Sequence, residues 1–275
     1  MAATYLDEII AWHRSMDHAD DASLGARALA ASEGDPPRGF AASLGMAAGR
    51  LAVIAEVKRR SPSKGPLSES LDPAALAAQY AAGGARCISV LTDAKFFGGS
   101  PEDLIAARGA CELPVLRKDF TLCLADVYEA RIMGADAVLL IAAALGDAKL
   151  ELLAGASADL GMDALVEVHD GLELERALAA GASLIGVNQR DLFSFEVDSE
   201  RAVSLAAAIP PGVLGVAESG IGGLADAERL ASAGYEAVLV GELLVRSPDP
   251  APVVQALSGV PVSSRVQRRG RLPCS

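Results

Sequence analysis

The amino-acid sequence predicts one α/β domain, a single (β/α)8 TIM barrel with an N-terminal helical extension. Eight short apolar runs rich in β-branched residues are bounded by turn residues, as is typical of buried parallel strands. Their starts lie about 20 to 35 residues apart, which leaves room for one helix and two short loops each. Eight alternations of strand and helix favour a closed barrel over an open sheet, which usually has fewer strands. The predicted strands cover residues 51–57, 86–91, 114–118, 136–141, 164–168, 184–188, 213–217 and 237–241.

A short phrase recurs along the chain: a helix that ends in glycine, a small residue, and then an apolar run. It occurs in AAGGARCISVL, IMGADAVLLI, AAGASLIGV and SAGYEAVLVG, and such repetition indicates one supersecondary unit used many times. The intervening segments carry helix end signals. Asp72-Pro73 supplies an N-cap followed by proline at the first helical position, and Gly83-Gly84 supplies the stop.

Residues 1–45 precede the first predicted strand and carry a helical pattern from about Tyr5 to Ala31, which Pro36-Pro37 interrupts. Two interpretations stay open for this extension. It could plug the bottom of the barrel, or it could form a lid beside the mouth, where Trp12 could touch an aromatic ligand. We expect the barrel, as the catalytic domain, to span residues 46–258.

The charge balance restricts the partners. A formal net charge of -12 argues against nucleic acid, which needs a basic face, whereas an acidic small molecule can still bind where a few cations gather. The tail, residues 259–275, is short and basic, and we expect a disordered, solvated end rather than a binding arm. Its arginines are Arg265, Arg268, Arg269 and Arg271.

The compartment predicted is the cytoplasm. The start MAATYLDEII has no basic region followed by an apolar stretch, and no segment approaches the roughly 20 apolar residues that span a bilayer. The four cysteines form no C-x-x-C pair and are interpreted as incidental thiols of a reduced chain.

Charged residues gather where the predicted strands end. Glu56 and Lys58 share strand parity, so they point to the same side, and the carboxyl ends of barrel strands are where active sites form. The N-terminal strand ends are expected to carry almost no charge. A structural layer of ion pairs is the alternative, but pairing alone does not explain why these groups crowd one rim. The set comprises Glu56, Lys58, Lys118, Glu167, Asn188, Arg190, Glu218 and Ser219.

A phosphate site is predicted after the last two strands. The segment from Ser219 to Gly223, ending in Gly-Ile-Gly-Gly, follows the seventh strand, and Gly241-Glu242 opens a short helical stretch after the eighth. Loops at these two places form the recurrent phosphate cradle of such barrels. Ser61, in SPSKG, could add a hydroxyl from the opposite side, although an ordinary Ser-Pro turn is the alternative.

Seven motifs in order resemble the strand-end motifs of the indole-3-glycerol-phosphate synthase family. They are IAEVKRRSPSKG, SVLTDAKFFGGS, LRKDF, LVEVHD, GVNQRDL, AESGI and VLVGELL, spread from about residue 51 to 246. The segment PPRGFAASL before the barrel also resembles the family's entry segment. The resemblance implies ring closure, decarboxylation and dehydration of a phosphorylated carboxyphenylamino-deoxyribulose, with no metal or organic cofactor.

The resemblance also implies catalytic roles. Lys118 matches the general acid at the substrate ketone, and Glu167 matches the carboxylate of the acid–base steps toward dehydration. Lys58 matches a second lysine for the substrate carboxylate and later proton transfers, with Glu56 orienting the lysines. Asn188 holds the ribulose part, and Ser219 completes the catalytic set.

Binding roles follow in the same way. Arg190 is expected beside the anthranilate carboxylate, and Glu218 lines the same mouth. The remaining matches are the apolar walls, Phe96, Phe120 and Leu192, and the phosphate site, Ser61, Gly220, Gly241 and Glu242.

Three departures from the family pattern stand out. The segment after Phe120 has Cys123, Ala125 and Asp126 in place of the usual residues, and Leu243 stands where serine is common. The N-terminal helix is more acidic than usual. His169 follows Glu167 at strand parity, and we interpret it as a helix-facing or mouth-edge histidine without a catalytic part.

Two rival functions are weighed. Phosphoribosylanthranilate isomerase would need a Cys or Asp base and an Asp acid at strand ends, whereas these strands end in Lys and Glu. A non-catalytic relative would have lost Lys58, Lys118 or Glu167 by drift. We expect a small phosphorylated substrate, no nucleic acid or membrane partner, and a monomer or weak oligomer.

Overall fold

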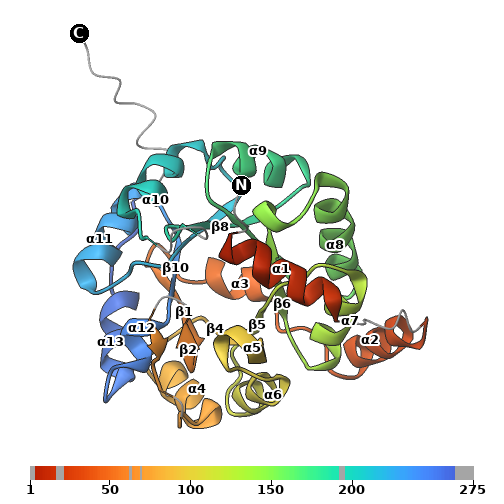
Figure 1. The fold of residues 1–275 in the computed structure, drawn as a ribbon. Helices are drawn as coiled ribbons and strands as arrows, with labels where there is room; N and C mark the ends of the chain where they lie inside the picture. The colour runs from red at the N-terminus through yellow and green to blue at the C-terminus, as the bar shows by residue number, and fades with distance from the viewer. Residues whose placement is uncertain (1–3, 17–21, 62–63, 69, 192–195, 264–275) are drawn as a thin grey trace.

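The computed structural model describes residues 4–16, 22–61, 64–68, 70–191 and 196–263, and its centre is a closed parallel barrel (Figure 1). The strand order is β1-β10-β9-β8-β7-β6-β5-β4, which confirms the predicted fold class. Each strand lies within one residue of its predicted limits at either end. The strands are β1 (Ala52–Val57), β4 (Cys87–Leu91), β5 (Val115–Lys118), β6 (Ala137–Ile141), β7 (Asp163–Val168), β8 (Leu184–Asn188), β9 (Leu214–Glu218) and β10 (Ala237–Val240).

Helices surround the barrel in the predicted alternation. Asp72 caps the first of them through its carboxylate, which accepts hydrogen bonds from the backbone of Ala74 and Ala75, and Gly83 ends it as predicted. A small hairpin of β2 (Arg60–Ser61) and β3 (Gly65–Pro66) follows β1. The helices of the ring are α4 (Pro73–Ala82), α5 (Ala94–Phe97), α6 (Pro101–Gly109), α7 (Leu124–Ile132), α8 (Asp147–Asp159), α9 (Gly171–Ala179), α10 (Ser199–Leu205), α11 (Leu224–Ala233), α12 (Glu242–Val245) and α13 (Pro250–Ser258), with short 3-10 turns at Ala142–Ala144 and Ala206–Ala208. No helix among the described residues is long and apolar enough to cross a membrane.

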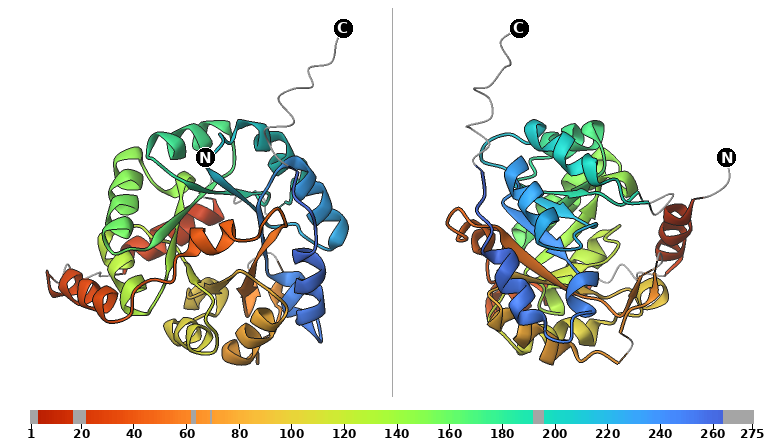
Figure 2. Two further views of the ribbon diagram at one scale, coloured as in Figure 1. Left: turned by 180° about the vertical axis from the view of Figure 1, so that it is seen from behind. Right: turned by 90° about the vertical axis from the view of Figure 1, so that its left-hand side faces the viewer.

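The N-terminal extension serves both ends of the barrel. Its helical pattern forms two helices, α1 (Tyr5–Ser15) and α2 (Ala22–Gly34), rather than one, and a third, α3 (Phe40–Gly45), follows the prolines. Helix α1 lies across the mouth in Figure 1, and the rear view in Figure 2 shows α3 across the opposite end. Helix α2 packs against α7 on the outside. The lid position therefore belongs to α1 and the plug position to α3.

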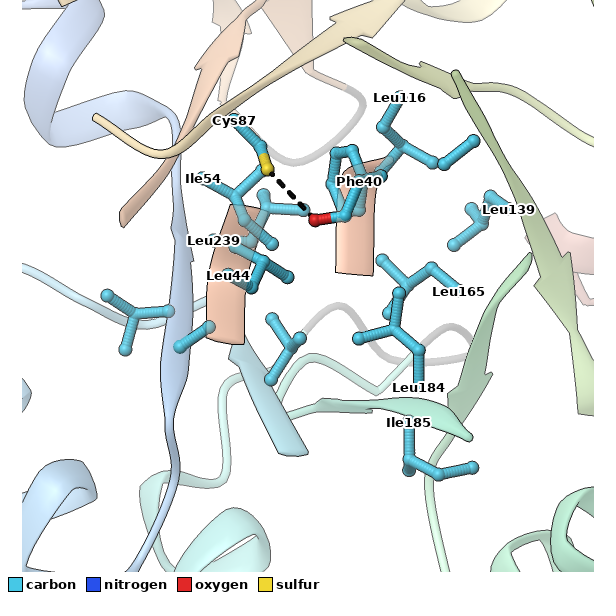
Figure 3. Close-up of a cluster of buried hydrophobic side chains, with 14 of the residues drawn as sticks. Phe40, Leu44, Ile54, Cys87, Leu116, Leu139, Leu165, Leu184, Ile185 and Leu239 are labelled. Carbon is cyan, nitrogen blue, oxygen red and sulfur yellow. Dashed lines mark hydrogen bonds between the residues drawn. The ribbon is translucent and has the colours of Figure 1, made fainter. Parts of the chain in front are cut away.

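The lower core of the barrel is apolar and is closed by α3. Phe40 and Leu44 of this helix are fully buried among inward-pointing leucines and isoleucines of the strands (Figure 3). The thiol of Cys87, at the start of β4, lies 3.5 Å from the backbone oxygen of Phe40. Close packing of this kind stabilises the closed end. Strand residues of this cluster include Ile54, Leu116, Leu139, Leu165, Leu184 and Leu239.

Carboxylates at the N-terminal strand ends contradict the expectation that these ends carry almost no charge. Asp136 is fully buried and accepts hydrogen bonds from the backbone of Arg38 and Val115, at 2.9 and 2.7 Å, and from Arg108 at 3.1 Å. Asp163 accepts one from the backbone of Ala41 at 2.9 Å. Buried backbone N–H groups that no neighbouring strand satisfies need such acceptors, so these charges are structural.

The end of the last helix leads back beneath the barrel. The backbone N–H of Leu51 donates to Val260 at 2.8 Å, and Arg50 pairs with Pro261 in an isolated antiparallel bridge. The first residues of the predicted tail are thus held by the strand that opens the barrel. Its arginines lie outside the described residues.

We predict that Phe40→Ala lowers the free energy of unfolding by about 3–5 kcal/mol, because it leaves a cavity at the closed end. Met46→Ala, at a 62% exposed position just after α3, is the matched control and should change it by less than about 0.5 kcal/mol. Urea unfolding of both variants checks this. Equal stability of Phe40→Ala and the parent would contradict the plug assignment.

Candidate active site

A cavity of about 1280 Å³ opens at the carboxyl ends of the strands, beneath α1. Lys118, Glu167 and Glu218 reach it from β5, β7 and β9, which are separated widely in sequence and alternate around the barrel. Most of the residues predicted for the site line this cavity, namely Glu56, Lys58, Ser61, Lys118, Phe120, Glu167, Asn188, Arg190, Glu218, Ser219, Gly220, Gly241 and Glu242. Phe96 is not among them, and Leu192 lies outside the described residues.

The Lys118 ammonium is the centre of the polar layer. Its Nζ lies 3.4 Å from Oε2 of Glu167 and 3.7 Å from Oε2 of Glu218. Burial lowers the pKa of Lys118, but the carboxylates of Glu167, Glu218 and Glu56 outweigh burial and raise it above its usual range. Lys118 is therefore a cation at neutral pH, held at the base of the cavity.

The surroundings of the two carboxyl groups beside Lys118 shift their pKa values in opposite directions. Burial and the neighbouring Glu167 raise the pKa of Glu218 to about 8. Burial also raises the pKa of Glu167, but Lys118 and His169 outweigh it, so the pKa of Glu167 lies below its usual value. The surroundings therefore favour the ionised form of Glu167 and the protonated form of Glu218. Gly186 of β8 makes room for this group, because a Cβ there would clash with Oε1 of Glu218.

A second lysine–glutamate pair lies on β1 and the residue after it. The Lys58 ammonium bonds directly to Oε2 of Glu56, as their shared strand parity implies. Gly241, after β10, faces this pair, and a Cβ at that position would clash with the Glu56 carboxylate. The glycine thus allows the Glu56–Lys58 pair to approach the backbone that begins α12.

The ends of β8 and β9 are joined by hydrogen bonds that fix their side chains. Oδ1 of Asn188 accepts a hydrogen bond from the backbone of Arg190 at 3.0 Å, and the Gln189 amide donates to the backbone oxygen of Ser219 at 2.7 Å. Ser219 has a φ of +64°, a left-handed conformation that non-glycine residues adopt at some energetic cost. Strain at a residue that lines the cavity is characteristic of functional sites.

The predicted phosphate region forms one side of the cavity. Gly220 and the Gly241–Glu242 segment border it, with Ser61 on the β2 hairpin. The Glu242 carboxylate lies 3.2 Å from Nε of Arg246, so its charge is paired. Two cations that sequence reasoning missed, Lys64 and Arg246, also line the cavity. Lys64 stands in the SPSKG motif, which could have indicated it, whereas nothing in the sequence marked Arg246.

The aromatic wall consists of Phe97 and Phe120, whose ring centroids lie 6.4 Å apart. Phe96, the predicted wall residue, instead turns under α1, where its ring meets the edge of Tyr5 at 5.8 Å. The difference arises because α5 is a single turn, on which consecutive side chains point in different directions. The sequence indicated an aromatic wall residue through the adjacent pair Phe96 and Phe97. It did not show which of the two faces the cavity.

Helix α1 covers the mouth with Tyr5, Leu6 and Ile9, all of which line the cavity. Trp12 does not line it: this side chain is 40% exposed, with the Lys95 ammonium 3.5 Å from its ring centroid.

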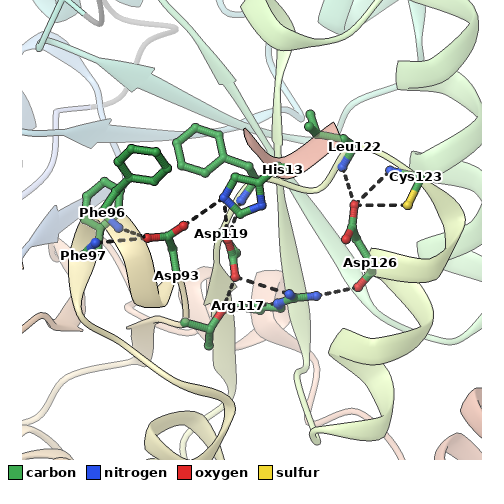
Figure 4. A network of polar contacts seen from close by, with 11 residues as sticks. His13, Asp93, Phe96, Phe97, Arg117, Asp119, Leu122, Cys123 and Asp126 are labelled. Carbon is green, nitrogen blue, oxygen red and sulfur yellow. Dashed lines mark hydrogen bonds and ion pairs between the residues drawn. The ribbon is translucent and has the colours of Figure 1, made fainter. Parts of the chain in front are cut away.

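A buried histidine ties α1 to the barrel. Nε2 of His13 lies 2.8 Å from Oδ2 of Asp93 and 4.0 Å from Oδ1 of Asp119, in the loops after β4 and β5 (Figure 4). Asp93 in turn caps α5. Among the described residues these three groups are the set whose ligand atoms come close enough for a metal ion, but the direct His13–Asp93 bond already accounts for their approach.

The unusual segment after Phe120 is ordered by its own hydrogen bonds. Asp126 accepts them from the backbone of Leu122 and Cys123, at 2.7 and 3.0 Å, and so caps α7 (Figure 4). Arg117, on the outward face of β5, donates to the backbone oxygen of Asp126 at 2.7 Å. The departures at Cys123 and Asp126 therefore form a helix start outside the cavity lining.

His169 lies next to the charged layer. It follows β7 directly, and its Nε2 lies 3.5 Å from Oε1 of Glu167. Burial lowers the pKa of His169, but Glu173 and Glu167 outweigh it and raise the pKa above its usual value.

Comparisons with known proteins agree with this geometry. The family model for indole-3-glycerol phosphate synthase matches residues 6–257. Indole-3-glycerol phosphate synthase 2 of Streptomyces coelicolor is 52% identical over 229 residues, covering 83% of this chain and 88% of that protein. The indole-3-glycerol phosphate synthase of Mycolicibacterium vanbaalenii is 48% identical over 256 residues, covering 93% and 94%.

More distant solved structures share the fold alone. A thiamine phosphate pyrophosphorylase from Pyrococcus furiosus gives a TM-score of 0.58 at 15% identity, covering 76% of this chain and 94% of that one. A structure described as native KDPGal gives 0.53 at 16% identity, covering 75% and 92%. Since the family model spans nearly the whole chain and its relatives are about half identical, the chain belongs to the indole-3-glycerol phosphate synthase family.

Proposed function

We propose that the charged layer of the cavity converts 1-(2-carboxyphenylamino)-1-deoxyribulose 5-phosphate into indole-3-glycerol phosphate, with release of CO2 and water. Membership of the family makes the chain a carboxy-lyase of tryptophan biosynthesis. The comparisons support this reading, and not phosphoribosylanthranilate isomerase or a non-catalytic relative. The observation that carries the residue roles is the placement of the Lys118 ammonium between two carboxyl groups, at the base of the cavity.

Ring closure is assigned to Lys118. When the aromatic carbon attacks the substrate ketone, negative charge grows on the ketone oxygen. A buried ammonium at that oxygen stabilises the charge and supplies a proton, a contribution typically of about 10²–10⁴ in rate. The raised pKa of Lys118 keeps the proton on the ammonium until the oxygen becomes basic enough to take it.

The later steps are assigned to Glu167 and Lys58. Loss of CO2 leaves its bonding electrons in the ring system and restores aromaticity. Dehydration then needs a base for one proton and an acid for the departing hydroxyl. Glu167, which is ionised, suits the base, and Lys58, which Glu56 orients, suits the acid. Asn188 and Ser219 would hold the ribulose part beside them.

Substrate binding divides the cavity into two sides. Arg190 would pair with the anthranilate carboxylate, and Phe97 and Phe120 would face the aromatic ring, with Leu192 as a further wall residue. Glu218 would line the same mouth in its protonated form. The phosphate would lie against the backbone N–H groups of Gly220, Gly241 and Glu242, with the Ser61 hydroxyl opposite.

We further propose that residues 46–258 are the catalytic unit, that residues 1–45 supply its lid, and that residues 259–275 take no part. We propose a monomer or weak oligomer in the cytoplasm, as suits a biosynthetic enzyme with a small-molecule substrate.

Turnover tests the proposed function. The purified protein should form indole-3-glycerol phosphate, which is measured by the appearance of indole fluorescence. Lys118→Ala should lower kcat by at least about 10²-fold, because the cation at the ketone oxygen is lost. Lys149→Ala, an exposed lysine outside the cavity, is the control and should keep the parent rate. Melting curves would verify that Lys118→Ala is folded. A folded variant with near-normal kcat would remove Lys118 from the acid role.

Inorganic phosphate should compete with the substrate, since the same backbone N–H groups would bind both. We expect the apparent KM to rise several-fold at tens of millimolar phosphate with kcat unchanged, and Ser61→Ala to weaken this inhibition. Chloride at equal ionic strength controls for screening. An apparent KM that does not change with added phosphate would count against the phosphate site.

His13→Ala should raise KM by about tenfold while changing kcat less, because α1 loses its tie to Asp93 and no longer holds Tyr5, Leu6 and Ile9 over the mouth. Ser15→Ala, on the exposed side of the same helix, serves as the comparison. Hydrogen exchange in residues 5–15 should quicken in His13→Ala. Unchanged exchange and KM would show that the bond does not hold the lid.

A further inference from the structure

A line of three ionisable groups runs from the surface to the charged layer. Oε2 of Glu173, in the first turn of α9, accepts hydrogen bonds from the backbone N–H of His169 at 2.8 Å and contacts its Nδ1 at 3.1 Å. The opposite ring nitrogen, Nε2, lies 3.5 Å from Oε1 of Glu167. The His169 side chain is only 13% exposed and Glu167 only 2%. Within the described residues, Nε2 has no hydrogen-bond partner of its own.

This arrangement fixes the tautomer of His169. A carboxylate can only accept, so Nδ1 beside Glu173 must carry a hydrogen. Nε2 then faces Oε1 of Glu167 across 3.5 Å, and a charged imidazole presents its Nε2–H on the side of that oxygen.

The Glu167 carboxylate lies between a lysine and a histidine. Its Oε2 faces the Lys118 ammonium and its Oε1 faces the His169 imidazole. Lys118 also faces Glu218, so the attraction of Lys118 for Glu167 is shared. When it is protonated, His169 adds a second positive charge at Oε1.

We propose that His169, fixed by Glu173, is a positioning residue for Glu167, which holds this carboxylate in place and favours its ionised form. The inference rests on the proposed function for Glu167 as an acid–base group. In the state where His169 is charged, Glu167 is oriented and ionised, ready to accept a proton from the substrate. The imidazole keeps its own proton in this step, and its charge favours the ionised carboxylate that acts as the base.

The surrounding charges agree with the cationic form of His169. Glu173 and Glu167 both favour it, and Arg201 of α10 is the positive group that opposes it. On the other side, Lys118 and His169 favour the anionic form of Glu167. Lys118 is in turn influenced by Glu218 and Glu56.

Imidazole ¹⁵N spectroscopy tests the tautomer without any turnover. The chain has only three histidines, so the spectrum is simple, and His169→Gln assigns the signal. We expect Nδ1 of His169 to be protonated throughout the titration, and the ring to titrate above pH 6.5. Glu173→Gln and Glu167→Gln should each lower that titration point, because each removes a negative charge beside the cation.

The pH profile tests the effect on Glu167. Rate falls on the acid side when Glu167 gains a proton, so removal of the neighbouring cation should move this limb of kcat/KM to higher pH. We expect a shift of about one pH unit in His169→Gln and in Glu173→Gln, so that kcat/KM falls by up to about tenfold at pH values below the midpoint of the acid limb. Glu175→Gln, the same change at an exposed site on the same helix, should keep the parent profile.

The outcomes separate the two proposals. A parent protein that turns over the substrate, with superimposable pH profiles in His169→Gln and Glu173→Gln, would overturn the role of His169 alone. The role of His169 would also be overturned if its Nδ1 carried no proton, or if Glu173→Gln did not change the pH at which His169 titrates. Both results can be obtained even from a protein without activity. Absence of turnover in the parent would instead contradict the proposed function.

Discussion

The structure depends on one buried cation, the Lys118 ammonium, and on the two carboxyl groups that meet it from β7 and β9. An unpaired charge at this depth would cost several kcal/mol, so the layer can exist only if its charges balance. The surroundings favour this balance, because they lower the pKa of Glu167 and raise that of Glu218. The closed barrel brings these three groups together, because the carboxyl ends of its strands converge at one mouth. Each of the three side chains lies on a strand and not on a loop.

The two ends of the barrel use charge for different purposes. At the N-terminal strand ends, Asp136 and Asp163 accept hydrogen bonds from backbone N–H groups and so complete the packing around α3. At the carboxyl ends, the charged groups of Glu56, Lys58 and Lys118 line the cavity, where a substrate can reach them. The N-terminal extension links the two ends, with α1 above the mouth and α3 below the core.

The strands and their carboxyl ends could be predicted from sequence because apolar runs and turn residues are local signals. The same is true of Glu56 and Lys58, whose shared side follows from strand parity. Phe97, the lid contacts of Tyr5 and the tie at His13 could not, because each depends on how a short helix is oriented by distant residues. His169 showed the right parity, but its meaning depends on Glu173, whose position is set only when α9 packs.

The glycines beside the charged layer restrict how this barrel could be altered. Side chains of Glu218 and Glu56 occupy the space that a Cβ at Gly186 or Gly241 would fill, so these strands cannot gain bulk without displacing a carboxyl group. A change of substrate preference therefore has little freedom at the strand ends. The adaptable surfaces are the underside of α1 and the single turn of α5, where side chains touch the cavity without belonging to the ionic layer.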